Sequence, residues 1–434
     1  MPAPSTTAAA ALGSRHWRSG LAAWLGWFFD GLDMHLYTLI ALPMVASLMG
    51  AEVGALAVRE RSAFIMAAFM LGWALGGTAF GLLGDRIGRS RTLVLTILTY
   101  SCCTGLSYFA SSWQELAVLR FLTALGIGGE WAVGAALLSE TWPSTYRPLL
   151  AAVLQSAVNL GVMTAALACY LLAAAPHRTV FLVGLAPALV TLWIRRAVPE
   201  SAEWHRARSG EAPAQPRLRA LFAPGCARLS WLVMSCCALS LTGHWACMFW
   251  ALQQLRGLEQ LQGWSEEARN HLASEVLILL SVSAVVGNFL AALLARRLGY
   301  RRAMILLFLA YALTMGACYA VSRPLSTLLP FLAATGLCQG VFALFTMYLP
   351  PLFPTLMRTT GAGFCYNIGR IAAAIGIVVF GMLAPVGDVR VALLGAAALF
   401  LPAAVVAWFL PEPPADPAPA ESAVEPAAGP PQRG

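Results

Sequence analysis

The sequence contains no lysine and has few charged residues of any kind. Only 11% of its 434 residues are charged, whereas 59% are hydrophobic. So small a polar fraction excludes a water-soluble globule, because too little polar surface exists to cover one. The net charge of +8 comes from 28 arginines that flank apolar runs. Topological bias explains this charge better than a nucleic-acid-binding surface does.

Sequence motifs of metal, nucleotide and hydrolytic sites are also missing. No HExxH, P-loop, dinucleotide fingerprint or recognisable Ser/His/Asp order occurs, and the ten cysteines match no zinc or redox spacing. We therefore expect no enzyme activity, no cofactor, no metal and no ATP-driven pumping.

Apolar runs fill most of the chain. Crossing about 30 Å of hydrocarbon takes roughly 20 apolar residues per helix, and runs of that length, separated by charged or Pro/Gly residues, indicate an all-α membrane protein with twelve transmembrane helices. The expected spans are 21–49, 62–84, 92–110, 114–138, 150–172, 179–196, 229–252, 273–295, 303–321, 326–350, 360–382 and 389–410.

The arginines predict how these spans are oriented. With the N-terminus inside, 19 arginines fall in cytoplasmic segments, 7 outside and 2 within spans. This distribution predicts a multi-pass protein of the bacterial inner membrane with both termini in the cytoplasm. The first 20 residues show no cleavable signal pattern.

A repeat with an offset of 211 residues divides the chain. GDRIGRSR at 84–91 is matched by ARRLGYRR at 295–302, and TWPSTYR is matched by LFPTLMR, so that Pro143 and Arg147 correspond to Pro354 and Arg358. Several matches at one offset predict two six-helix halves. The expected domains are a tail (1–20), the N-terminal half (21–196), a cytoplasmic linker (197–228), the C-terminal half (229–410) and a Pro/Ala-rich disordered tail (411–434).

Three motifs carry a family resemblance. GLLGDRIGRSR at 81–91 resembles the loop signature of the major facilitator superfamily, and RFLTALGIGGEW at 120–131 followed by SETWPSTYR resembles its fourth-span signature. DGLD, GGEW and the GxGxxxxxGR pattern at 361–370 are most similar to the aromatic-acid and metabolite:proton symporters. The resemblance implies the major facilitator fold and alternating access. The second-half loop departs from the pattern, with Arg296 and Tyr300 where the first half has Asp85 and Arg89.

Acids in the first span indicate proton coupling. Asp30 and Asp33 lie on one helical face, where two carboxylates repel each other, so the buried pair is expected to hold and release a proton. Gly31 between them lets a neighbouring helix pack closely. A purely structural role, in which the acids accept helix hydrogen bonds, remains the alternative.

Two arginines fall within spans. Depth arithmetic puts Asp33 roughly 20 Å above the inner edge and Arg120 about 9 Å below the outer edge, which is the same level, so the two are expected to pair. Arg370 comes out at the midplane, where a substrate carboxylate would bind. A structural pair of Arg120 with Asp33 or Glu130, without substrate contact, remains open. The full set of expected substrate-binding residues is Arg120, Arg370, Tyr37, Gln155, Asn159, Tyr366, Asn367 and His244.

The loop between spans 2 and 3 is expected to form a gate. Its glycines allow a tight turn, and Asp85 can accept hydrogen bonds from arginine and from a helix N-terminus in the other half. Glu130 comes out near the cytoplasmic face, where gating is likelier than ligand contact. The expected gating residues are Gly81, Asp85, Arg86, Gly88, Arg89, Glu130, Glu140, Arg147 and Arg358.

Together these patterns predict a transporter that imports a small organic anion, an aromatic or aliphatic carboxylate, with protons. The expected partners are the anion, protons and the lipid bilayer, with the monomer as the functional form and no nucleic acid. A proton-driven exporter of cationic drugs, a sugar:proton symporter and a transporter-like receptor are the alternatives. Two arginines within spans argue against the exporter, and a sugar site would need more Asn and Gln.

Overall fold

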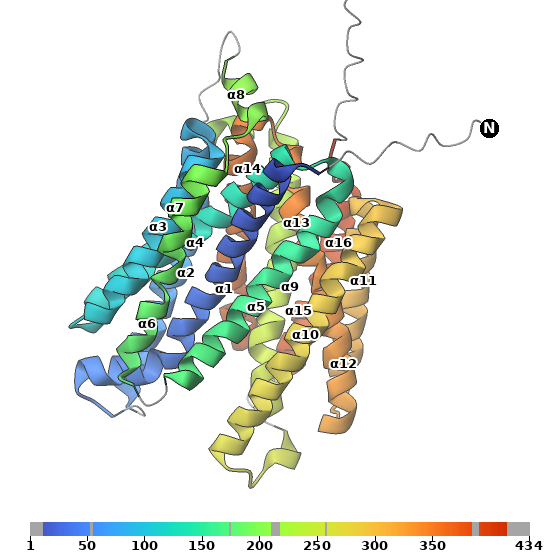
Figure 1. Ribbon diagram of the computed structural model, residues 1–434. Coiled ribbons are helices and arrows are strands. Elements are labelled where there is room, and N and C mark those ends of the chain that lie inside the picture. Colours follow the sequence, from blue (N-terminus) through green and yellow to red (C-terminus); the bar gives the residue numbers. More distant parts are fainter. Residues whose placement is uncertain are drawn as a thin grey trace, which may run out of the picture.

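Helices make up nearly all of the computed structural model, which describes residues 12–52, 55–172, 175–209, 218–256, 258–383 and 390–414 (Figure 1). The N-terminal half comprises α1 (Ser14–Met49), α2 (Leu56–Ile87), α3 (Arg89–Leu106), α4 (Trp113–Thr141), α5 (Arg147–Leu171), α6 (Val180–Val183) and α7 (Ala186–Ala197). The connecting helix is α8 (Ala202–Arg208). The C-terminal half comprises α9 (Ala227–Arg256), α10 (Glu266–Leu298), α11 (Tyr300–Tyr319), α12 (Leu325–Cys338), α13 (Gly340–Tyr348), α14 (Arg358–Leu383), α15 (Arg390–Ala398) and α16 (Phe400–Trp408).

Short 3-10 turns occupy several connections. They are η1 (Ser107–Phe109), η2 (Ser144–Tyr146), η3 (His177–Thr179), η4 (Leu218–Phe222), η5 (Glu259–Leu261), η6 (Pro350–Leu352) and η7 (Thr355–Met357).

Each of the twelve expected spans coincides with a helix or with two consecutive helices. In the described part of the chain, ten helical stretches are long and apolar enough to cross a membrane, and a shorter apolar stretch covers His177–Thr191. The remaining expected span falls on α14, a 26-residue helix. The all-helical fold predicted from the sequence is therefore confirmed.

Three spans are interrupted, which hydropathy did not predict: α6 and α7, α12 and α13, and α15 and α16. At the second of these, a Cβ on Gly340 would lie only 2.1 Å from the carbonyl oxygen of Gly287. The break therefore occurs where α10 approaches the backbone at the start of α13, which only glycine permits.

The boundaries differ from expectation at both ends of the chain. Helix α1 begins at Ser14, several residues before the expected span. Residues 411–414, assigned to the disordered tail, are described and make hydrogen bonds within the C-terminal half, whereas 415–434 lie outside the described residues.

The two halves lie side by side, blue to green on one side and yellow to red on the other (Figure 1). Within the N-terminal half, α1 and α5 pack in backbone contact, because a Cβ on Gly31 would lie 2.3 Å from the Val158 carbonyl oxygen. The close packing expected at Gly31 is confirmed. Between the halves, α2 packs against α14 and α5 against α10.

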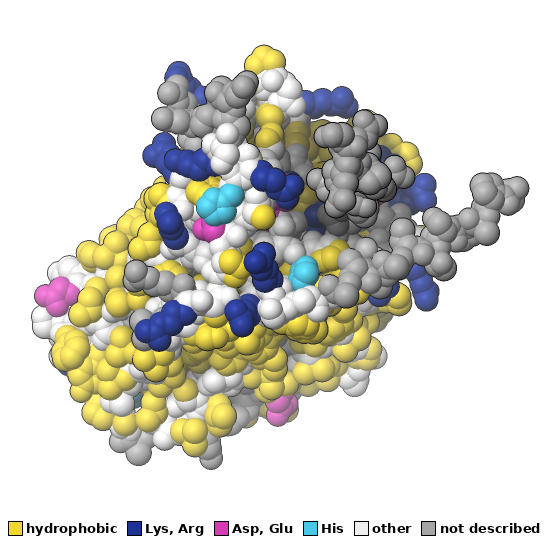
Figure 2. Space-filling view, turned by 45° about the horizontal axis from the view of Figure 1, so that its top comes forward, with side chains coloured by type: hydrophobic (Ala, Val, Ile, Leu, Met, Phe, Trp, Pro, Cys, Tyr) yellow, Lys and Arg dark blue, Asp and Glu magenta, His cyan; other side chains and the backbone are white. Residues whose placement is uncertain are grey.

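Charge gathers at one end of the bundle. We call the end at which α1 begins, and where α2 turns into α3, the arginine-rich end. Figure 2 shows basic side chains concentrated there and a mostly hydrophobic flank below. Exposed arginines of this end include Arg15, Arg18, Arg86, Arg91, Arg206, Arg296, Arg297 and Arg302.

Candidate functional site

A buried ion pair joins α1 to α4. Arg120 Nη1 lies 3.5 Å from Asp33 Oδ2, and the two side chains are 0% and 1% exposed. The other guanidinium nitrogen donates to Thr104 Oγ1 at 2.9 Å and Ser107 Oγ at 3.0 Å. The pairing predicted from depth is confirmed. Arg120 is enclosed within the N-terminal half, so in this conformation it holds Asp33 instead of facing the interface between the halves.

The second acid of α1 faces a different partner. Asp30 lies against Glu130 of α4, and Tyr100 of α3 lies against Glu130 in turn. Glu130 is fully buried, and outside Asp30 and Tyr100 its carboxyl oxygens have no described hydrogen-bond partner. A Cβ on Gly26 would lie 1.7 Å from Glu130 Oε1, so the carboxyl lies beside the first turns of the expected span of α1, in agreement with the predicted depth. The contacts of Glu130 give its expected gating role no support.

Arg370 of α14 lies at the interface between the halves. Its Cζ is 3.9 Å from the ring centroid of Trp73 on α2 and 4.8 Å from that of Tyr366. Its Nη1 donates to Asn367 Oδ1 at 2.8 Å. The side chain is only partly buried, and no described carboxylate lies within ion-pair distance. The guanidinium thus contacts two aromatic rings, and part of the side chain remains exposed.

An aromatic column continues from this arginine into the N-terminal half. Tyr366 stacks on Trp131 with centroids 4.3 Å apart and planes 16° apart, and Trp131 stacks on Trp27 at 6.4 Å. Since Trp131 belongs to α4 and Tyr366 to α14, the column bridges the two halves. Neither Trp73 nor Trp131 was singled out from the sequence, although the GGEW motif ends at Trp131.

Asn367 fixes Arg370 because its own position is tightly constrained. Its amide nitrogen donates to the Gly363 carbonyl at 2.7 Å. A Cβ on Gly77 of α2 would lie 1.7 Å from that nitrogen. Glycine at this position therefore makes room for the amide between α2 and α14.

The other expected substrate-binding residues are spread more widely. His244 of α9 bonds Tyr311 OH through Nδ1 at 3.0 Å and contacts the Phe342 ring. Tyr37 is buried within the N-terminal half, and Gln155 and Asn159 are partly buried on α5.

At the arginine-rich end, Asp85 ties the halves together. Its Oδ2 accepts from Thr360 N at 2.8 Å and from Thr360 Oγ1 at 2.6 Å, and its Oδ1 accepts from Thr359 N at 3.3 Å. These donors belong to the first turn of α14, so the carboxylate caps a helix of the other half. The predicted acceptor role of Asp85 is confirmed.

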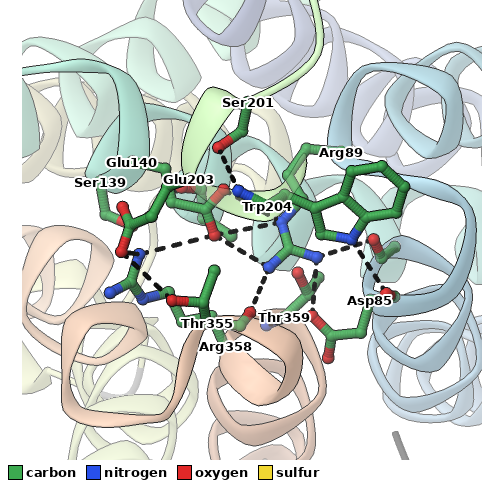
Figure 3. A network of polar contacts seen from close by, with 12 residues as sticks. Asp85, Arg89, Ser139, Glu140, Ser201, Glu203, Trp204, Thr355, Arg358 and Thr359 are labelled. Carbon is green, nitrogen blue, oxygen red and sulfur yellow. Dashed lines mark hydrogen bonds and ion pairs between the residues drawn. The ribbon is translucent and has the colours of Figure 1, made fainter. Parts of the chain in front are cut away.

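Arg89 is the fully buried centre of the same network (Figure 3). It donates to Asp85 Oδ1 at 2.8 Å and to Glu140 Oε1 at 2.9 Å, and also to the Thr355 carbonyl oxygen of the other half. Arg358 lies 3.6 Å from Glu140. Four of the expected gating residues, Asp85, Arg89, Glu140 and Arg358, thus meet in one network that joins the two halves at this end.

The linker contributes three residues that the sequence analysis missed. Glu200 accepts from the backbone N–H of Arg89 at 2.7 Å, Trp204 Nε1 donates to the Asp85 carbonyl at 3.0 Å, and Glu203 pairs with Arg358 at 2.8 Å. Ser201 caps α8 by accepting from Trp204 N. The Ser-x-x-Trp start of a short helix after Pro199-Glu200 was the available signal.

The remaining expected gating residues lie around this network. Arg86 is exposed, and no described acid pairs with it. Gly88 has φ 108° at the α2–α3 turn, and Gly81 packs against the Thr359 backbone. Arg147 donates to the Ser139 carbonyl at 2.9 Å and to the Pro414 carbonyl at 3.3 Å.

Known proteins resemble this chain over most of its length. A family model described as the Major Facilitator Superfamily matches residues 19–268 and 259–431. A probable 4-methylmuconolactone transporter of Cupriavidus pinatubonensis is 34% identical over 372 residues, covering 83% of this chain and 82% of the relative. A cis,cis-muconate transport protein of Acinetobacter baylyi is 27% identical, covering 94% and 97% of the two chains.

Solved structures agree in fold. A proton:xylose symporter superposes with a TM-score of 0.74 at 18% identity, covering 92% of this chain and 96% of that one. A human organic anion transporter gives a TM-score of 0.70 at 16% identity, covering 90% and 99%. At such identities the likeness concerns the fold alone. The apolar helices, the family model and the relative at 34% identity show that the chain is a multi-pass membrane protein of the major facilitator superfamily, a family of transporters and not of enzymes.

Proposed function

We propose that this protein imports a small, planar organic anion together with protons by alternating access. The observation that carries the proposal is Arg370, a guanidinium at the interface of the halves without a described carboxylate partner. Burying such a charge is costly unless an anion compensates it. A substrate carboxylate supplies that anion.

The surroundings of Arg370 favour a flat substrate. The rings of Trp73 and Tyr366 lie 3.9 and 4.8 Å from the guanidinium carbon, so a carboxylate would bind the part of the group that the rings leave uncovered, through paired N–H groups. The column of Tyr366, Trp131 and Trp27 offers an aromatic wall against which a conjugated acid can stack. A muconate-type, benzoate-type or nicotinate-type acid meets both conditions.

The names of relatives support the same class. Besides the two named for 4-methylmuconolactone and cis,cis-muconate, a relative from Bacillus subtilis is named as a putative niacin/nicotinamide transporter. All three names denote small molecules with a planar unsaturated ring or chain.

Of the two carboxyls of α1, Asp30 carries the coupled proton in this proposal. Asp33 forms a permanent pair with Arg120, which keeps α1 and α4 in register, while Asp30 exchanges protons. The arginine-rich end faces the cytoplasm of a bacterial inner membrane, as the arginine distribution favours. The Asp85–Arg89–Glu140–Arg358 network closes that side while the site fills from outside, and one chain suffices for the cycle.

Uptake into proteoliposomes tests the proposal. The panel is benzoate, cis,cis-muconate, nicotinate, acetate and xylose, each with and without an inward proton gradient. We expect gradient-dependent accumulation of an unsaturated acid. Accumulation of xylose alone would favour the sugar symporter, and efflux of a cationic dye driven by the gradient would favour the exporter. Acid uptake that ignores the gradient would contradict proton coupling.

The role of Arg370 is tested by Arg370→Lys. Lysine keeps the charge but loses the flat fork and most of the stacking, so the KM of acid uptake should rise about tenfold while maximal velocity changes less. Arg302→Lys, on an exposed side chain of the same half, is the matched control. An unchanged KM in Arg370→Lys would place the substrate elsewhere.

A further inference from the structure

The contact between Asp30 and Glu130 leaves two acids facing each other inside the N-terminal half. A Cβ on Gly26, one turn before Asp30, would lie only 1.7 Å from Glu130 Oε1. The Glu130 carboxyl therefore occupies the space that glycine leaves on α1, next to Asp30. The juxtaposition is built into the backbone packing of α1 against α4.

This pair has no counter-charge at contact distance. Glu130 and Tyr100 are both 0% exposed, and the Tyr100 hydroxyl, both Glu130 oxygens and Asp30 Oδ1 have no described hydrogen-bond partner outside this group of three residues. Arg120, the arginine of α4, is paired with Asp33. Two carboxyls and a hydroxyl therefore have only one another as polar neighbours within contact distance in the described structure.

Charged and titratable side chains from three other positions face this pair. Asp30 faces Glu130 on α4, Asp33 on its own helix and Arg370 on α14, and Glu130 also faces Tyr100 on α3. Arg370 lies beyond ion-pair distance. Two carboxylates in contact in a low-dielectric interior cannot both be ionised, so at least one proton must reside between them.

We infer that Asp30 and Glu130, with the hydroxyl of Tyr100, form the proton-binding site, and that Asp33 is not part of it. The inference rests on the proposed function, whose coupling residues it narrows. It also gives Glu130 a role in proton binding in place of the gating role expected from the sequence, which its contacts do not support.

Arg370 links this site to the substrate. When an acid binds Arg370, its carboxylate compensates the guanidinium, and the Asp30–Glu130 pair holds two protons, so that both carboxyls are neutral. When the acid leaves, the uncompensated guanidinium attracts a negative charge on Asp30. The Asp30 proton then departs to water on the same side, while Glu130 keeps the other proton. A carboxylate and a proton therefore enter and leave together, and for a monoanion the loaded site carries no added charge.

Infrared difference spectroscopy tests the site without any substrate. In reconstituted membranes at neutral pH, we expect the carbonyl-stretch band of a protonated carboxyl, shifted by deuterium, to lose intensity in Asp30→Asn/Glu130→Gln relative to wild type. The matched control Asp33→Asn/Arg120→Gln removes a charge pair from the same two helices and should keep the full band. Loss of the band in the control, or its retention in the first variant, would overturn the inference.

Transport measurements separate the inference from the proposed function. Glu130→Gln should lose gradient-driven accumulation of the acid identified in the panel but retain exchange of labelled for unlabelled acid, because exchange needs no net proton release. A merely structural role would abolish both. Wild type that accumulates no acid with the gradient would defeat the proposed function, whereas a wild type that does so alongside an equally active Glu130→Gln would defeat only this inference.

Discussion

The two halves share a backbone plan but differ in their buried chemistry. At the 211-residue offset, Asp33 corresponds to His244, Tyr100 to Tyr311, Arg120 to Phe331 and Glu130 to Val341. The N-terminal half thus buries two acids and an arginine where the C-terminal half has a neutral His244–Tyr311 hydrogen bond and apolar side chains. At these positions, the N-terminal half buries charged side chains, and the C-terminal half buries neutral and apolar ones.

Arg370, the proposed substrate-binding arginine, shows the opposite distribution, because the charged residue lies in the C-terminal half. Tyr366, Asn367 and Arg370 of α14 correspond to Gln155, Ser156 and Asn159 of α5. In the proposed mechanism, the C-terminal half therefore supplies the cation that binds an anion, and the N-terminal half supplies the acids that bind a proton. If the halves move against each other as proposed, each site is sensitive to the position of the other.

The largest effect is expected from breaking the charged pair of the N-terminal half. Asp33→Asn leaves Arg120 buried without its carboxylate, which should lower the free energy of unfolding by roughly 3–5 kcal/mol. The corresponding change in the other half, His244→Gln, removes one neutral hydrogen bond and should cost about 1 kcal/mol. Thermal unfolding of the purified variants in detergent measures both. Equal losses would show that the halves do not differ in this way.

A smaller effect is expected at the gate. Asp85→Asn weakens the contact with Arg89 and the cap on α14, which should cost about 1.5–3 kcal/mol of gate closure. Hydrogen–deuterium exchange should increase in the first turn of α14. Arg296, the counterpart of Asp85 in the C-terminal half, is exposed, so Arg296→Gln should leave exchange there unchanged. Increased exchange in both variants would contradict the assignment of the inter-half network to the loop between α2 and α3.

The smallest effect concerns a feature in which the halves agree. Glu200 accepts from the backbone at the start of α3, and Glu412 accepts from Tyr300 N and Arg301 N, both at 3.0 Å, at the start of α11. Glu200→Gln and Glu412→Gln should each cost about 0.5–1 kcal/mol and increase amide exchange only in the helix that is capped. Increased amide exchange in only one of the two variants would show that the two caps are not equivalent.

The sequence predicted the features that depend only on position along the chain or on depth in the membrane. Span positions follow from hydropathy, and the Asp33–Arg120 pair follows from depth because the side chains lie at one level. Asp85 was assigned correctly because an acid in a tight turn beside a helix start has few alternatives.

Features that depend on rotation and tilt were missed. Depth alone does not show which face of α4 meets α1, so Glu130 was assigned to the gate although it faces Asp30. The ring contacts of Arg370 come from Trp73 on α2 and Tyr366 on α14, and no pattern along the chain predicts that these two rings meet. The part of Trp204 in the gate depends on the short α8, whose seven residues carry too little periodicity to be recognised.

The acids that end each half have a consequence for how the protein is made. Glu200 follows the last helix of the first half and Glu412 the last helix of the second, and each returns to the third helix of its own half. Each half can therefore form its own carboxylate-to-backbone contact as soon as its last span has been synthesised. The first half can thus complete this contact before the second half is translated.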